Sequence, residues 1–239
     1  MAIHVGTETV DHQMANWFGD PSQKEIVALA TKDALKKLDE EIEKYEAKGF
    51  PTDSWKRYGR KTNEKPNAED VEWFREVGIP NSITAYVDWR LENDDLVLAD
   101  IPGFGVAIEV PFNHYVGDQL VHGFIDRVFT SKTVGGFYPL DIKSGLKPKT
   151  SEQLGLYAAA LSKALGWQIE YGYYVYGLKS GVAKMTPPIK LTGWTDDLLS
   201  RIYLPATEAI NAGIFIPNPG DGCYICSVAE HCEFTQALI

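Results

Sequence analysis

Five polar residues between positions 123 and 157 have types and spacings that suit phosphodiester hydrolysis: Asp126, Asp141, Lys143, Gln153 and Tyr157. Two carboxylates that face each other repel, so such a pair is favourable mainly when a cation lies between them. Carboxylate oxygens are ligands that Mg2+ and Mn2+ prefer. A cation held there would polarise a phosphate and activate a water molecule, while Lys143 would orient that water or offset developing negative charge.

Two strands must position the acids. The segments 120–130 (LVHGFIDRVFT) and 136–145 (GFYPLDIKSG) are rich in β-branched and aromatic residues, and SKTVGG between them predicts a hairpin turn. A turn centred on Thr133 and Val134 sets Asp126 almost opposite Asp141. Because side chains alternate along a strand, Lys143 points the same way as Asp141, whereas Leu140 and Ile142 point into the protein.

A helix must position the remaining two residues. Gly145 and Pro148 end the second strand, and Thr150 or Ser151 can cap a helix over 152–165 (EQLGLYAAALSKAL). Gln153 and Tyr157 then lie one turn apart. Two other roles stay open at this point, because Thr150 and Gln153 have the spacing of a capping box and Tyr157 fits an ordinary core position.

The order G-x-x-D, D-I-K and Q-x-x-x-Y resembles the RecB-like branch of the PD-(D/E)XK nucleases. The resemblance implies that Asp126 and Asp141, with the backbone carbonyl of Ile142, bind Mg2+ or Mn2+, and that Lys143 is catalytic. It also implies that Gln153 and Tyr157 help to hold DNA.

The resemblance extends towards the N-terminus. Glu109 in GVAIEVPF stands where family members often carry a glutamate, which makes it a further candidate metal ligand. Family members also often carry a G-T-x-x-H stretch whose histidine binds the metal. Here Val10 occupies that position, so the ligand would be His12 or Asp11 after a shift of one or two residues, and a solvated surface pair is the alternative.

Three cysteines lie near the C-terminal end of the sequence: Cys223, Cys226 and Cys232. In a reducing compartment this spacing indicates a metal rather than disulfides. It resembles the C-terminal part of the iron-sulfur site of some RecB-like exonucleases, including the one that works in CRISPR adaptation. A fourth cysteine is absent, so His4 and His231 are candidate ligands, and zinc is the alternative metal.

Composition fits a soluble enzyme. The 239 residues are 44% hydrophobic, which is enough for one domain spanning 1–239, and no apolar run is long enough to cross a bilayer. We therefore expect a cytoplasmic protein, in the host cytoplasm if phage-encoded. The formal charge of -10 opposes long-range attraction to DNA, although Lys132, Lys147 and Lys149 would line the site.

The remaining patterns predict the other elements. Residues 6–18 begin a helix, and a second, long helix follows Pro21. The polar stretch 54–70, with Trp55 and Tyr58, is interpreted as a surface loop in preference to a base-stacking segment. Strands are expected within 83–94, 94–100, 105–112 and 169–178, the last beside the D-I-K strand, and a final helix over 195–213 is interrupted near Pro205.

These observations predict an α/β fold, with a mixed central sheet flanked by helices, a nuclease-like core over about 105–180 and a cysteine clasp over about 215–235. The predicted function, by family resemblance, is metal-dependent exonucleolytic hydrolysis of DNA ends, often single-stranded, in recombination, repair or spacer processing. The alternative is a non-catalytic nucleic-acid or partner-binding protein that keeps this fold and uses the cysteine site structurally.

Overall fold

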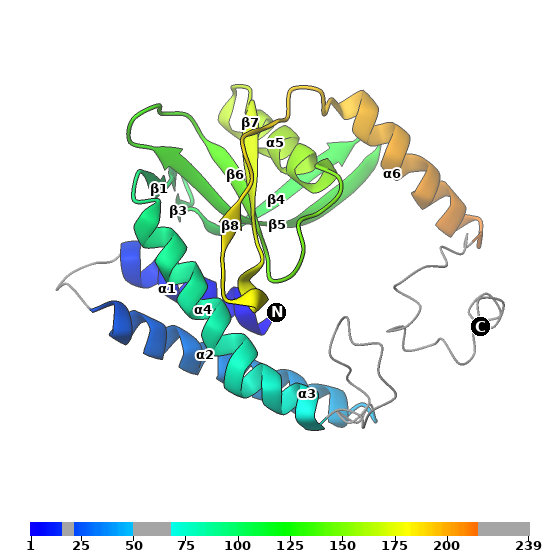
Figure 1. Cartoon of the computed structure of the whole chain (residues 1–239). Helices are drawn as coiled ribbons and strands as arrows, with labels where there is room; N and C mark the ends of the chain where they lie inside the picture. Colours follow the sequence, from blue (N-terminus) through cyan, green and yellow to red (C-terminus); the bar gives the residue numbers. More distant parts are fainter. Residues whose placement is uncertain (16–21, 50–67, 215–239) are drawn as a thin grey trace.

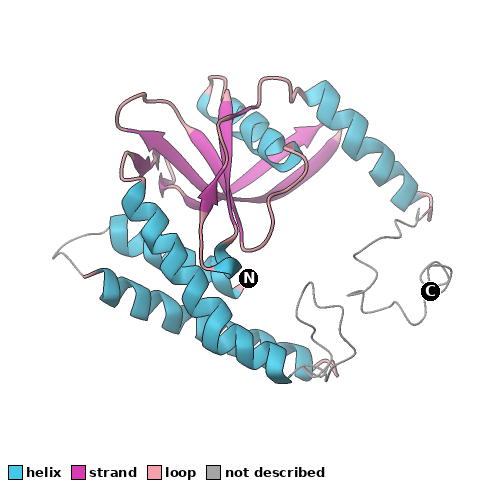
Figure 2. Ribbon diagram, in the orientation of Figure 1, coloured by secondary structure: helices cyan, strands magenta, loops and turns pink. Residues whose placement is uncertain are grey.

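The computed structural model describes residues 1–15, 22–49 and 68–214. A mixed sheet separates two groups of helices, with α1, α2 and α4 on one side and α5 on the other (Figure 1). Figure 2 shows the same arrangement by element type. This is the α/β architecture expected from the sequence. The predicted cysteine clasp and the Trp55 and Tyr58 segment lie outside the described residues.

Three helices form the N-terminal layer. α1 (Ala2–Ala15) overlaps the helix predicted over 6–18 but begins earlier. α2 (Gln23–Glu46) is the long helix predicted after Pro21. A capping box starts α2, because the Ser22 side chain accepts from the Glu25 backbone N–H and the Glu25 carboxylate accepts from the Ser22 N–H at 2.8 Å. The helices α3 (Ala68–Trp73) and η2 (Phe74–Gly78) lead into α4 (Ile79–Glu92).

The expected strand within 83–94 is wrong, because these residues form α4. The aromatic and β-branched content suggested a strand, but Ile79, Ile83, Tyr86 and Arg90 are all buried and recur at the three- and four-residue spacing of one helix face. Pro80 stands in the first turn, where its missing N–H costs nothing. Periodicity over a longer window therefore outweighs strand propensity here.

The sheet confirms the predicted hairpin and crossover. β5 (Gln119–Ser131) pairs antiparallel with β6 (Tyr138–Lys143), with Arg127 opposite Leu140, and β6 pairs in parallel with β7 (Tyr171–Tyr176). The parallel pair is joined by α5 (Glu152–Leu165), which has the predicted bounds. The strand order is β1-β5-β6-β7-β8, with β4 also on β5 and β9 also on β7.

The shorter elements complete the sheet. β4 (Ile108–Val116) forms a long hairpin with β5, and β1 (Leu96–Leu98) pairs with the other end of β5. A separate pair, β2 (Asp100–Ile101) and β3 (Gly105–Val106), flanks a turn in the segment IPGFG. After β7 come η3 (Leu178–Ser180), β8 (Lys184–Met185) and β9 (Ile189–Lys190).

Buried side chains pack on both faces of the sheet. Leu140 and Ile142 pack with the α1, α2 and α4 layer, and this confirms that they point into the protein. Val128 and Tyr174 pack with Leu154, Tyr157 and Leu161 of α5. Strands buried on both faces hold their backbone rigidly, which suits the positioning of a site.

The last described helix, α6 (Asp196–Asn211), runs without a break, so the expected interruption near Pro205 is wrong. Proline removes one intrahelical hydrogen bond but does not by itself end a helix, and Thr195 caps the first turn by accepting from the Leu198 N–H. Among the described residues, no helix has the length and apolar character needed to span a membrane.

Candidate active site

Three neighbouring strands bring three acids into one row. Glu109 on β4 lies opposite Asp126 on β5, because the pairs on either side of it are Ile108 with Arg127 and Val110 with Ile125. Continuing the β5–β6 register by one residue sets Asp126 opposite Asp141, as the sequence predicted. The two acids of the hairpin are thus neighbours on adjacent strands, with Glu109 on the third.

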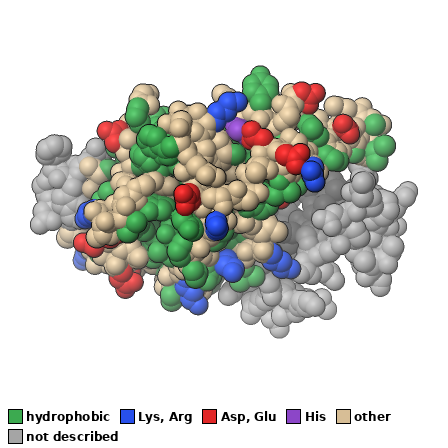
Figure 3. Space-filling view, turned by 90° about the horizontal axis from the view of Figure 1, so that it is seen from above, with side chains coloured by type: hydrophobic (Ala, Val, Ile, Leu, Met, Phe, Trp, Pro, Cys, Tyr) green, Lys and Arg blue, Asp and Glu red, His purple; other side chains and the backbone are tan. Residues whose placement is uncertain are grey.

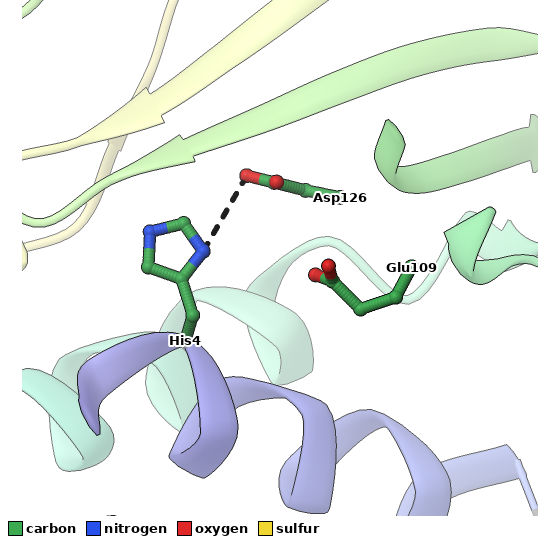
Figure 4. A group of neighbouring side chains, drawn as sticks. All are labelled: His4, Glu109 and Asp126. Carbon is green, nitrogen blue, oxygen red and sulfur yellow. Dashed lines mark ion pairs between the residues drawn. The ribbon is translucent and has the colours of Figure 1, made fainter. Parts of the chain in front are cut away.

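Glu109 has an unusual backbone. Its φ of 49° is the only positive φ of a non-glycine residue in the described part of the chain. Side chains other than glycine disfavour this region, so the surrounding structure must hold it there. The distortion lies within β4 directly beside Asp126, and the Glu109 side chain turns towards Asp126 and His4 (Figure 4).

His4 of α1 completes a group that can hold a metal ion. One ligand atom from each of His4, Glu109 and Asp126 lies within 4.8 Å of the other two, and His4 Nδ1 lies 3.7 Å from Asp126 Oδ2 (Figure 4). Glu8 lies one helical turn after His4 and is partly buried. Because of this spacing, α1 contributes both an imidazole and a carboxyl group on one side. Burial raises the pKa of Glu8.

Asp126 is fixed by the neighbouring strand. Its Oδ2 atom accepts a hydrogen bond of 2.7 Å from the backbone N–H of Ile142. The β5–β6 ladder ends at the adjacent pair, Arg127 and Leu140, so this side chain takes the place of the next backbone contact. The carboxylate is therefore oriented before any ligand binds.

A chain of contacts links Asp141 to α5. Lys143 Nζ lies 2.8 Å from one oxygen of Asp141 and donates to the other at 3.0 Å. The same Nζ donates to Gln153 Oε1 at 2.9 Å, and Gln153 Nε2 donates to the Tyr157 hydroxyl at 2.6 Å. The N-cap residue of α5 is Ser151 and not Thr150, and the Ser151 side chain makes no capping hydrogen bond. Gln153 thus takes part in the site's hydrogen-bond chain and not in a capping box, while Tyr157 is both buried and part of that chain.

The Arg127 side chain connects the elements that carry the site. Its fully buried guanidinium donates to Asp11 Oδ2 at 2.6 Å, to Glu109 Oε1 at 3.2 Å and to the backbone carbonyl of Asp126. It also reaches the Thr7 hydroxyl at 3.3 Å. One side chain thus joins α1, β4 and β5, the elements that carry His4, Glu109 and Asp126.

Charge is incompletely balanced in this group. Burial, and then the charge of Asp126, raise the pKa of Glu109 to about 7. Burial and Asp126 also raise the pKa of Asp141 to about 6, although Lys143 opposes the shift. Burial lowers the pKa of His4 despite the nearby Asp126 carboxylate, which favours a neutral imidazole. Carboxylate oxygens are suitable ligands for Mg2+ or Mn2+, and a neutral imidazole is a suitable further ligand for a transition-metal ion such as Mn2+.

The structure does not bring His12 to this group, which corrects that expectation. His12 is exposed and lies eight residues beyond His4 in α1, roughly 12 Å along the helix axis. Asp11 is also unavailable, because Tyr86, Arg90 and Arg127 all donate to its carboxylate. The histidine near the acids is His4, which the sequence had offered only for the cysteine site. His4 stands two residues before the GTETV segment, but its contact with Asp126 depends on how α1 packs against the sheet.

The described contacts of the group do not include the other candidate residues. Lys132, Lys147 and Lys149 are exposed, and the three cysteines and His231 lie outside the described residues. Within the described residues, the predicted residues Glu109, Asp126, Asp141, Lys143, Gln153 and Tyr157 are connected by the register and contacts above. His4, Glu8 and Arg127 are the neighbours that the sequence alone did not assign to this site.

Comparison with known proteins gives an independent result. Residues 9–233 match the family described as the PD-(D/E)XK nuclease superfamily. The matched range contains all the predicted acids, Lys143, Gln153, Tyr157 and the three cysteines, and it begins after His4.

Two phage proteins are similar to this chain. Gene 69 protein of Mycobacterium phage D29 is 30% identical over 189 residues, which cover 73% of this chain and 69% of that protein. Gene 69 protein of Mycobacterium phage L5 is 36% identical over 131 residues, which cover 53% of this chain and 44% of that protein. The aligned region thus spans less than half of the L5 protein.

Proposed function

Because this chain belongs to the PD-(D/E)XK nuclease superfamily, we propose that it is a Mg2+- or Mn2+-dependent exonuclease that hydrolyses phosphodiester bonds at DNA ends. The observation that carries the proposal is the row of Glu109, Asp126 and Asp141 with His4 beside it and Lys143 at its end. Similarity to two phage proteins supports a phage member of the family, and we propose that it acts inside the host cell in DNA recombination, repair or spacer processing.

Different residues of the site would have different roles in the proposed reaction. His4, Glu109, Asp126, Asp141 and the Ile142 carbonyl would hold the cation, which when bound would polarise the phosphate and lower the pKa of water. Lys143, held between Asp141 and Gln153, would orient the attacking water and stabilise negative charge on the phosphate. Gln153 and Tyr157 would keep the ammonium in place and contact the DNA backbone.

A cleavage assay tests this proposal. End-labelled single-stranded and duplex DNA would be incubated with the protein and Mg2+, Mn2+ or EDTA, with Asp126→Asn as the inactive variant. Asp100→Asn is a matched control, because Asp100 is an exposed acid on β2. We expect metal-dependent release of nucleotides from DNA ends by the wild type and the control only. Tight DNA binding without cleavage would favour the non-catalytic alternative.

We also propose that Cys223, Cys226 and Cys232 hold one metal centre, an iron-sulfur cluster completed by a further ligand. Three thiols within so short a segment have little reason to cluster in a reducing compartment unless a soft metal binds them. Iron and sulfide analysis of anaerobically purified protein tests this. Zinc would support the other metal site, and three freely titrating thiols without metal would refute both.

A further inference from the structure

One face of the β4–β5 hairpin is exposed and starts at the candidate active site. Six residues form this outer hairpin face: Pro111, Asn113, Tyr115, Leu120, His122 and Phe124. The register pairs Pro111 with Phe124, Asn113 with His122 and Tyr115 with Leu120. These pairs follow Glu109 and Asp126 directly along the two strands, so the face extends from the acids over roughly 20 Å.

The face is uncharged where a solvated hairpin is normally charged, and four of its six residues are apolar or aromatic. Phe124 is 59% exposed, Tyr115 is 55% exposed and Leu120 is 40% exposed. None of the six residues is a lysine, arginine, aspartate or glutamate. Exposed hairpins usually carry charges that prevent association, and contiguous exposed apolar surface commonly marks a binding site.

The opposite face of the hairpin is already used for packing. Phe112 contacts Tyr157 of α5 edge to face, with ring centroids 5.8 Å apart. His114 Nε2 lies 2.8 Å from Asp196 Oδ1 at the start of α6. The alternation of buried and exposed residues along β4 and β5 is therefore fixed by α5 and α6, and the aromatic side chains of the outer face cannot turn inward without breaking this packing.

We propose that the outer hairpin face binds unpaired nucleic-acid bases of the strand whose phosphate lies at the acids. Bases of a single strand expose flat π surfaces that stack on aromatic side chains, whereas a duplex covers them and is held mainly through its phosphates by cations. The outer face offers aromatic rings and no cation. Figure 3 shows charged side chains of both signs on the side of the molecule seen from above. The inference rests on the proposed nuclease function, because the strand is placed by its scissile phosphate.

Binding measured without metal tests this surface separately from catalysis. A short fluorescein-labelled oligothymidylate would be titrated with the wild type, Phe124→Ala, Tyr115→Ala and the double variant in EDTA. Each single substitution should raise the dissociation constant by about fivefold or more, because one stacked base is lost. Phe124→Trp should retain binding. Trp167→Ala is the matched control, since Trp167 is an exposed ring (51%) at the end of α5, where it stacks on Phe137.

The outcomes separate this inference from the nuclease proposal. Unchanged oligothymidylate affinity in the double variant would overturn the base-stacking role even if the protein cleaves DNA. So would an equal loss of affinity for a blunt duplex, which would indicate general damage to the binding surface. A wild-type dimer that becomes monomeric in the double variant would identify the face as a contact between copies and also overturn the proposal. Selective loss of single-strand binding in a protein that cleaves no DNA would support the surface and refute the nuclease.

Discussion

Asp11 and Asp126 are both buried and both contact Arg127, but they are neutralised very differently. Asp11 receives hydrogen bonds from Tyr86, Arg90 and Arg127, so two guanidinium groups and a hydroxyl compensate its charge. Arg127 contacts Asp126 only through its backbone carbonyl. The Asp126 carboxylate faces Glu109 and Asp141. A buried carboxylate with full pairing stabilises the fold, whereas one placed among other acids favours the binding of a cation.

The largest difference should appear in catalysis. Asp126→Asn removes a proposed metal ligand without changing the size of the side chain, so we expect the cleavage rate to fall by about a thousandfold or more. Asp141→Asn should behave in the same way. Single-turnover cleavage of end-labelled DNA at saturating Mg2+ measures the effect, and a rate within the error of the wild type would remove Asp126 from the site.

Substitution of Asp11 should damage stability instead. Asp11→Ala leaves the buried Arg127 and the nearly buried Arg90 without their shared carboxylate, which should lower the free energy of unfolding by about 3–5 kcal/mol. Urea denaturation of the metal-free protein measures this. Asp126→Asn is the matched comparison and should not destabilise the metal-free protein. Equal destabilisation by both substitutions would mean that the two aspartates have the same structural role.

Lys143 tests the link between the acids and α5. Lys143→Ala should lower the cleavage rate by about a hundredfold while affinity for DNA in EDTA changes little, because the ammonium is aimed at the reacting phosphate. Lys143→Arg should restore little activity, since a planar guanidinium cannot replace a compact ammonium between Asp141 and Gln153. Weakened DNA binding equal to the loss of rate would instead make Lys143 an ordinary phosphate contact.

The smallest effect should be a pH-dependent gain of stability. The folded-state pKa of Glu109 is raised from 4.5 to about 7 and that of Asp141 from 3.8 to about 6. The folded protein therefore binds more protons than the unfolded chain, and the contribution of these groups to stability falls as pH rises towards 7. Glu109→Gln should stabilise the metal-free protein by about 1 kcal/mol at pH about 8 and by nothing at pH about 4.

Thermal unfolding at several pH values in EDTA checks this prediction. Added Mn2+ should raise the wild-type melting temperature more at pH about 8 than at pH about 5, because protons compete with the cation for the same carboxylates. Asp100→Asn, at an exposed position of β2, is the control and should leave both profiles unchanged. A Glu109→Gln gain that is the same at every pH would exclude this electrostatic cause.

Local patterns predicted the centre of the site well. The turn at Thr133 and Val134 fixed the register of Asp126 and Asp141, and helical spacing fixed Gln153 and Tyr157. These elements are close in sequence, so strand alternation and turn chemistry are sufficient. The helix α4 was harder to predict, because aromatic and β-branched residues such as Tyr86 and Val87 favour a strand until their burial periodicity is known.

The residues that sequence reasoning missed depend on long-range packing. His4 meets Asp126 only because α1 packs against the sheet, and that packing is joined by Arg127 and Asp11, which are 116 positions apart. No local pattern contains such a contact. The left-handed backbone of Glu109 likewise depends on its neighbours and not on its residue type.

Calorimetric titration of Mn2+ into the metal-free protein near neutral pH tests most directly whether the row of Glu109, Asp126 and Asp141 holds a cation. The wild type and Asp100→Asn should show saturable binding of equal affinity. Asp126→Asn, His4→Ala and Glu109→Gln should each weaken it strongly, because each removes one ligand of the group. Saturable binding that is unchanged in Asp126→Asn, or no binding by the wild type, would contradict the assignment of this row of acids as a metal site.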